Sequence, residues 1–134
     1  MRRNYYSGKY SLDKHELLSA IHYALRYRKW RDEYDALSDS GKGISYDKDR
    51  VQSSGDYNPV EAAGIRRAEL STRINLIEQT AKETDPELYE WILQGVTDDF
   101  ATFKYLSTVK GMPCGKDKYY YSRRKFFFLL SQKI

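Results

Sequence analysis

The side chains best suited to chemistry in this sequence are the cationic ones of its last third, from Thr102 to Ile134. From Ala101 onward the chain carries eight Lys or Arg against a single acid, Asp117, a balance of +7. The first hundred residues carry fifteen Lys or Arg against eighteen Asp or Glu, a balance of −3. The net charge of +4 is therefore the sum of a mildly acidic first part and a strongly basic last third. Clustered cations interleaved with aromatic rings are typical of surfaces that bind nucleic acid.

The cationic residues lie on a pattern of two helices joined by a turn. We predict a helix over residues 103–110, capped by Thr102, and a second from about Lys116 to Gln132. Gly111 favours the left-handed backbone conformation that often ends a helix, and we expect residues 112–115 to form the turn. A preceding helix begins at Asp85-Pro86, because an aspartate followed by proline is a helix-start signal. Together the three helices have the proportions of a helix-turn-helix unit.

In a helix-turn-helix the second helix enters the major groove, and its N-terminal half touches base edges. The residues expected at base edges are Lys116, Lys118, Tyr119, Ser122 and Arg123. The residues expected at phosphates are Lys104, Lys110, Arg124 and Lys125. Lys and Arg donate to guanine acceptors, whereas contacts to phosphate position the protein without reading sequence.

A purely structural interpretation of the same segment stays open. The run FFFLL, with Phe127 and Leu130, is also typical of the core of a small three-helix unit, with Tyr120 as a further core position. On that interpretation the flanking Lys and Arg are only its solvated face. Helix-turn-helix patterns are degenerate, so the pattern alone does not decide between the two.

The first 84 residues predict two long helices. Residues 1–10 are expected to be a flexible basic arm, followed by a helix from about Leu12 to Leu37, whose first turn Ser11 can cap. Aromatic residues from Tyr23 to Tyr34 recur at steps of four and three, which predicts a seam against a partner helix. Residues 38–58 are rich in Gly, Ser and Asp and predict a mobile loop.

Asn58-Pro59 then starts the second long helix. We therefore expect an all-α fold with an antiparallel long-helix pair over residues 11–84 and a helix-turn-helix unit over residues 85–134. A second copy of the chain could also pack against this helix pair, which would give a homodimer through the long helices.

The sequence gives little support for disulfides, metal sites or catalysis. The lone Cys114 excludes a disulfide framework within the chain, and His15 and His22 are too far apart along a helix to share a metal. There is no phosphate-binding loop and no nucleophile motif, so we expect no catalytic residue, metal or cofactor. No apolar run approaches the roughly 18 residues of a membrane span, and the start is not a signal peptide. We expect a protein of the bacterial cytoplasm.

Two stretches carry a family resemblance: YLSTVKGMPCGKDKYYYSRRKFFFLLSQKI at residues 105–134 and ELSTRINLIEQTAKETDPELYEWILQGVT at residues 69–97. They resemble the RinA/ArpU-like late-gene transcriptional regulators of phages and prophages of Gram-positive bacteria, whose C-terminal part is similar to region four of sigma factors. The resemblance covers roughly Pro59 to Ile134 and implies that residues 116–125 recognise an operator or promoter. The chain departs from it at residues 113–115, which supply no Ser or Thr cap.

Three functions follow as hypotheses. The first is a sequence-specific transcriptional regulator of phage or prophage origin that binds double-stranded DNA and has RNA polymerase as a further partner. The second is a small terminase-like subunit of a DNA-packaging machine, which would also combine such a unit with assembling helices. The third is a protein-interaction module of a mobile element that acts on RNA polymerase or on a host defence protein.

Overall fold

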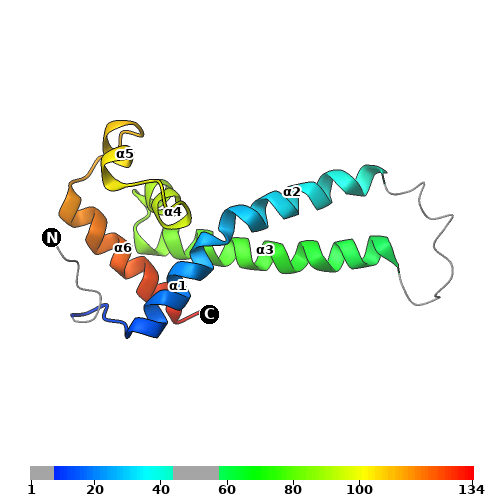
Figure 1. Cartoon of the computed structure of the whole chain (residues 1–134), viewed down its shortest axis with the longest axis horizontal. Helices are drawn as coiled ribbons and strands as arrows, with labels where there is room; N and C mark the ends of the chain where they lie inside the picture. Colours follow the sequence, from blue (N-terminus) through cyan, green and yellow to red (C-terminus); the bar gives the residue numbers. More distant parts are fainter. Residues whose placement is uncertain (1–7, 44–57) are drawn as a thin grey trace. The chain divides into compact units, whose positions relative to one another are not determined.

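The computed structural model describes residues 8–43 and 58–134, without the side chains of residues 38–43 (Figure 1). The described residues form helices and turns and contain no strand, which confirms the all-α class. The helices are α1 (Lys14–Leu25), α2 (Tyr27–Gly43), α3 (Pro59–Thr84), α4 (Tyr89–Thr97), α5 (Phe103–Thr108) and α6 (Lys116–Ser131). The predicted arm lies largely outside the described residues, as do residues 44–57 of the predicted loop 38–58. The prediction is wrong for residues 38–43, because they continue α2 as a helix.

The chain divides into two compact units. The bundle unit comprises Met1–Tyr27 and Leu76–Ile134, and the hairpin unit comprises Arg28–Asn75. This division differs from the predicted boundary between residues 84 and 85. The reason is that α1 packs against α6 and α4, so the first helix belongs to the same unit as the C-terminal helices.

The first predicted helix is interrupted at Arg26. This residue ends α1, and its N–H donates to the carbonyl of Tyr23 at 3.2 Å. The predicted cap Ser11 is also wrong, because Asp13 caps α1. The Asp13 carboxylate accepts from the Glu16 N–H at 2.8 Å, and the Glu16 carboxylate accepts from the Asp13 N–H at 3.1 Å. This reciprocal capping box satisfies two donors of the helix start. The hydrogen bond from the Glu16 N–H lowers the pKa of Asp13.

The Asn58 cap is confirmed, and the Asp85 signal marks a turn that precedes its helix. The Asn58 side chain accepts from the N–H groups of Val60 and Glu61 at 3.0 and 3.1 Å. The Asp85 carboxylate accepts from the Glu87 N–H at 2.9 Å, and α4 itself begins only at Tyr89.

The signals around α5 are confirmed, with one exception. The Thr102 hydroxyl accepts from the Tyr105 N–H at 3.2 Å, and Gly111 has a φ of 68°. The spacing of Phe103, Leu106 and Val109 predicts that all three face inward; Leu106 is buried, but Val109 is exposed. The difference arises because α5 ends at Thr108, so Val109 is its C-cap and does not continue the inward face.

The core of the bundle unit forms around α6. The residues that α6 buries are Tyr119, Ser122, Phe126, Phe127 and Leu130. The residues that α1 buries are Leu17, Ala20 and Ala24, and those of α4 include Ile92 and Val96. The predicted core residues Phe127 and Leu130 are confirmed, whereas Tyr120 is only half-buried and Tyr119 takes its place.

The packing of α6 against α4 depends on Gly95. A Cβ atom at this position would overlap the Tyr119 hydroxyl and lie 3.2 Å from Cδ1 of Leu106. Any larger residue at position 95 would therefore push the Tyr119 ring out of a core in which it is 2% exposed. Helix interiors disfavour glycine, so its presence in α4 reflects this close approach.

The hairpin unit pairs α2 with α3 through rings and guanidinium groups. The Arg73 guanidinium lies 5.3 Å from the Trp30 ring, and that of Arg67 lies 5.1 Å from the Tyr34 ring. Residue numbers rise along α2 as they fall along α3, so the two helices are antiparallel. This arrangement agrees with the predicted aromatic seam.

An ion pair lies beside these rings. Arg66 donates from Nε and Nη2 to the two carboxylate oxygens of Glu33, at 2.7 and 3.1 Å. The hydrogen bonds from Arg66 lower the pKa of Glu33. The hairpin is thus held by polar and cation–π contacts as well as by the buried residues Trp30, Leu70 and Ile74.

Two glycine substitutions test the packing argument. Gly64→Ala should raise the free energy of unfolding by up to about 1 kcal/mol, because nothing lies near its Cβ position and alanine favours a helix. Gly95→Ala gains the same propensity but must displace Tyr119, so it should lower stability by about 1–3 kcal/mol. Urea denaturation of both variants measures the difference. Equal stabilisation by the two substitutions would contradict the close approach at Gly95.

Candidate nucleic-acid interface

The connection between α5 and α6 spans residues 109–115, which is longer than the predicted turn of three or four residues. Its backbone is held from both sides. The Trp91 indole N–H donates to the Lys110 carbonyl at 2.9 Å, and the Met112 N–H donates to the Leu106 carbonyl at 3.0 Å. Met112 is itself buried. The turn therefore presents Lys110 on a fixed backbone.

Four predicted contact residues are exposed. Lys104 lies on α5, Lys110 on the connecting turn, and Lys116 and Lys118 on the first turn of α6. The Lys110 ammonium lies 5.9 Å from the Tyr105 ring. These side chains can reach phosphates without disturbing the fold.

The start of α6 adds to this positive charge. Gly115 is the N-cap and makes no side-chain hydrogen bond to the first amides of the helix. The N-terminal end of a helix carries a partial positive charge, and its unsatisfied N–H groups point along the axis. Beside Lys116 and Lys118, this end suits an anionic ligand such as a phosphate.

Two of the predicted base contacts are wrong. Tyr119 is 2% exposed and Ser122 is 4% exposed, so neither can touch a base edge. Both lie on the inward face of α6, where the Tyr119 ring packs 5.9 Å from the Phe103 ring. The helix is rotated so that Tyr119 and Ser122 face the core.

Arg123 is engaged within the protein. Its Nη1 donates to the Gly95 carbonyl at 2.8 Å, and its guanidinium lies 5.1 Å from the Phe127 ring. It therefore satisfies a carbonyl in the last turn of α4 and is a poor candidate for reading bases. Lys133 is engaged in a similar way, because it pairs with Glu83 at 2.8 Å.

The outward stripe of α6 is formed by Lys118, Tyr121, Lys125 and Phe128, which follow steps of three and four. Tyr121 is 46% exposed, and the Arg124 guanidinium lies 5.9 Å from its ring. Arg124 and Lys125 are half-buried. Sequence reasoning missed Tyr121. The signal that could have found it is its position three residues after Lys118 and four before Lys125.

The residues just before α1 lie against this stripe. The Tyr10 ring lies 5.7 Å from the Tyr121 ring and 5.4 Å from the Phe128 ring, and the Lys125 ammonium lies 6.0 Å from it. The pKa of Tyr10 is lowered: desolvation raises it, but the hydrogen bond with Tyr121 and the charges of Lys125 and Lys9 outweigh that. The Tyr10 ring therefore packs on Tyr121, Lys125 and Phe128 of the stripe, while Tyr121 keeps 46% of its surface exposed.

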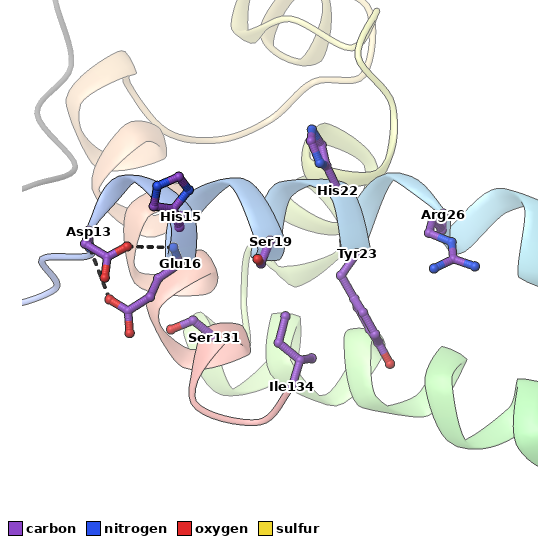
Figure 2. Close-up of a pocket in the computed structure, with 9 residues that line it drawn as sticks. All are labelled: Asp13, His15, Glu16, Ser19, His22, Tyr23, Arg26, Ser131 and Ile134. Atoms are coloured by element: carbon purple, nitrogen blue, oxygen red, sulfur yellow. Dashed lines mark hydrogen bonds between the residues drawn. The ribbon is translucent and has the colours of Figure 1, made fainter.

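A hollow of about 730 Å³ lies along α1 (Figure 2). His15, Ser19, His22 and Arg26 share one face of α1, and Ser131 and Ile134 close the hollow from the end of α6. Figure 2 also shows the capping hydrogen bonds between Asp13 and Glu16 at its edge. The described residues contain no group of three or more His, Cys, Asp or Glu that could hold a metal.

The remaining candidate for chemistry is Cys114 in the connecting turn. It is half-buried, and burial raises the pKa of its thiol, with Asp85 adding to this effect and Lys118 opposing it. A raised pKa disfavours the thiolate that a nucleophile requires. The charge of Lys118 thus does not outweigh the effect of burial, and the thiol is not activated.

No helix among residues 8–43 and 58–134 has the length and apolar character needed to cross a membrane. The chain matches no protein-family model, no curated protein and no solved structure. The resemblance to RinA/ArpU-like regulators therefore stays a prediction, and function is argued from the surface itself.

A pair of substitutions separates structural from surface cations. Arg123→Ala should lower the free energy of unfolding by about 1–3 kcal/mol, because it leaves the Gly95 carbonyl without its donor. Lys116→Ala should change it by less than about 0.5 kcal/mol, since Lys116 is exposed. Denaturation in urea measures both. A larger loss for Lys116→Ala than for Arg123→Ala would contradict these assignments.

Proposed function

We propose that the chain binds double-stranded DNA through a cationic surface made of Lys104, Lys110, Lys116 and Lys118 together with the open end of α6. The observation that carries the proposal is that all four lysines are exposed while Tyr119, Phe126 and Phe127 of α6 fill the core. The excess charge of this segment therefore faces solvent beside a helix start that no side chain caps. Such a surface is suited to the phosphate backbone, which supplies most of the affinity of nucleic-acid binders.

Base contacts are assigned to the outward stripe instead of the inward face. Lys118 and Tyr121 are the exposed members in the N-terminal half of α6. Lysine can donate to guanine acceptors in the major groove, and an aromatic ring can contact the thymine methyl group. Lys104, Lys110 and Lys116 act as phosphate contacts that set the orientation of the helix.

The biological role proposed for this binding is regulation of transcription in a phage or prophage, within the bacterial cytoplasm. It rests on the resemblance to RinA/ArpU-like regulators together with the cationic surface. The α2–α3 hairpin would bring two copies together, so that two α6 helices read two half-sites. RNA polymerase is the further partner that this role implies.

The salt dependence of binding tests the surface. The double variant Lys104→Ala/Lys116→Ala should reduce the log–log slope of affinity against salt by about 2, because two phosphate contacts are lost. Fluorescence anisotropy with short duplexes tiling the region upstream of the chain's own gene measures the slope. Lys29→Ala is the matched control, since Lys29 is exposed on α2 and outside the surface.

Two outcomes would overturn the assignment. The first is the absence of any complex with duplex DNA at low salt. The second is an equal loss of affinity in Lys29→Ala and in the double variant, which would indicate attraction by the net charge of the chain and no defined surface.

A DNA-packaging subunit is the second candidate, and one feature of the hairpin unit favours it. Val60 and Ile65 on α3 are 63% and 57% exposed, so the hairpin offers apolar side chains for assembly. A regulator is expected as a monomer or a dimer, whereas a packaging subunit is expected as a closed ring of many copies.

Mass measurement decides between the two candidates. Light scattering after size exclusion should give a monomer or a dimer, and a ring would favour packaging. If the hairpin carries the association, Ile65→Glu should lower the mass of any oligomer, because a charge is costly inside an apolar contact. Leu18→Glu on α1 is the matched control for adding a charge at an exposed apolar position and should leave the mass unchanged.

A further inference from the structure

Two lysine ammonium groups lie at one tyrosine ring beside α6. The Nζ atom of Lys9 lies 5.4 Å from the centre of the Tyr10 ring, and that of Lys125 lies 6.0 Å from it. Lys9 and Tyr10 precede α1, whereas Lys125 belongs to the outward stripe of α6. These three residues, which we call the Tyr10 cluster, join two distant parts of the sequence.

The chain around Lys9 is held by the residues that follow it. Leu12 is 3% exposed and belongs to the core. The Tyr10 ring lies 5.7 Å from the Tyr121 ring and 5.4 Å from the Phe128 ring. Lys9 itself is exposed. Its ammonium group is therefore brought to α6 without being buried.

Two cations at one ring repel each other, which costs free energy that a bound anion would recover. Packing of the Tyr10 ring on α6 does not require a second cation. The phenol already responds to the positive potential: desolvation raises the pKa of Tyr10, but the hydrogen bond with Tyr121 and the charges of Lys125 and Lys9 outweigh that. An anionic oxygen is thus stabilised at the cluster, and phosphates carry such oxygens.

The length of α6 suits the two edges of a DNA groove. Lys125 follows Lys116 by nine residues. At about 1.5 Å per residue this corresponds to about 14 Å along the helix. The major groove is about 12 Å wide, with phosphates along both edges. Lys118 and Tyr121, which we assign to base edges, lie between these two ends.

We propose that Lys9 and Lys125, brought together at the Tyr10 ring, form a second phosphate-binding site that holds the opposite edge of the major groove. The inference rests on DNA binding by the cationic surface, which holds the first edge through Lys116 and its neighbours. An acidic protein segment is a less suitable occupant. The reason is that the contact between Tyr10 and Tyr121 makes the cluster continuous with the residues assigned to base edges.

The salt dependence of duplex binding by the full chain, measured by fluorescence anisotropy, tests this site. Lys9→Gln/Lys125→Gln should reduce the log–log slope of affinity against salt by about 2, because two phosphate contacts lose their charge. Lys29→Gln/Lys82→Gln is the matched control and should keep the slope. It removes the same charge from exposed positions, and the Lys82 ammonium also lies 5.4 Å from a tyrosine ring, that of Tyr89.

A second pair of variants tests whether the Tyr10 ring positions Lys9. Tyr10→Ala removes no charge, yet it should reduce the slope by about 1, because Lys9 is no longer held beside α6. Tyr89→Ala removes the ring beside Lys82 and should keep the slope. Helical circular dichroism should be the same in both variants as in the wild type.

Neutral methylphosphonate linkages in the tightest-binding duplex locate the two edges. Single replacements should weaken wild-type binding at two sets of positions. Lys9→Gln/Lys125→Gln should become insensitive to one set, and Lys104→Ala/Lys116→Ala to the other. The two sets should lie on opposite edges of the major groove.

Several results would overturn the second site. They are an unchanged slope in Lys9→Gln/Lys125→Gln or in Tyr10→Ala, an equal fall in the charge control, and sensitive phosphates on one edge only. Displacement of the duplex by poly-glutamate from the wild type, but not from Lys9→Gln/Lys125→Gln, would indicate an acidic protein as the occupant. If the slope still responds to Lys104→Ala/Lys116→Ala, only the second site is wrong. If the wild type forms no complex at low salt, DNA binding itself is wrong, and this site with it.

Discussion

The close approach of α4 and α6 at Gly95 is the contact on which the rest of the bundle unit depends. Because Gly95 has no Cβ, the Tyr119 ring can lie against α4, and Arg123 reaches the Gly95 carbonyl one turn further along. These two contacts fix the rotation of α6 about its axis. Lys118 and Tyr121 face outward as a result, so the position of the proposed DNA surface follows from a packing contact on the opposite face of the helix.

That rotation could not be predicted from the sequence of α6 itself. The helix carries three consecutive tyrosines at 119–121 and three consecutive phenylalanines at 126–128, so every rotation buries aromatic rings. The deciding residue is Gly95, which is far along the chain and whose role appears only when α4 and α6 meet. Lys116 and Lys118 at the helix start are exposed, as a contact with DNA requires, whereas the burial of Tyr119 and Ser122 makes their predicted base contacts wrong.

Local signals predicted more of the fold than distant ones. The caps at Asn58 and Thr102 and the left-handed Gly111 depend on residues within one turn, and the structure contains all three. The break at Arg26 has no such signal, since neither Gly nor Pro lies near it. It falls where the chain passes from the bundle unit to the hairpin unit, just before Arg28, and the packing of α1 against α6 gives the physical reason.

The two units also use their positive charge differently, which bears on where a polyanion would bind. In the hairpin unit, Arg66 pairs with a carboxylate, and Arg67 and Arg73 lie over aromatic rings. A guanidinium engaged in this way must give up existing contacts before it can bind a phosphate. Lys104 and Lys116 are exposed side chains on a structured backbone, so moving their ammonium groups toward a phosphate costs little free energy.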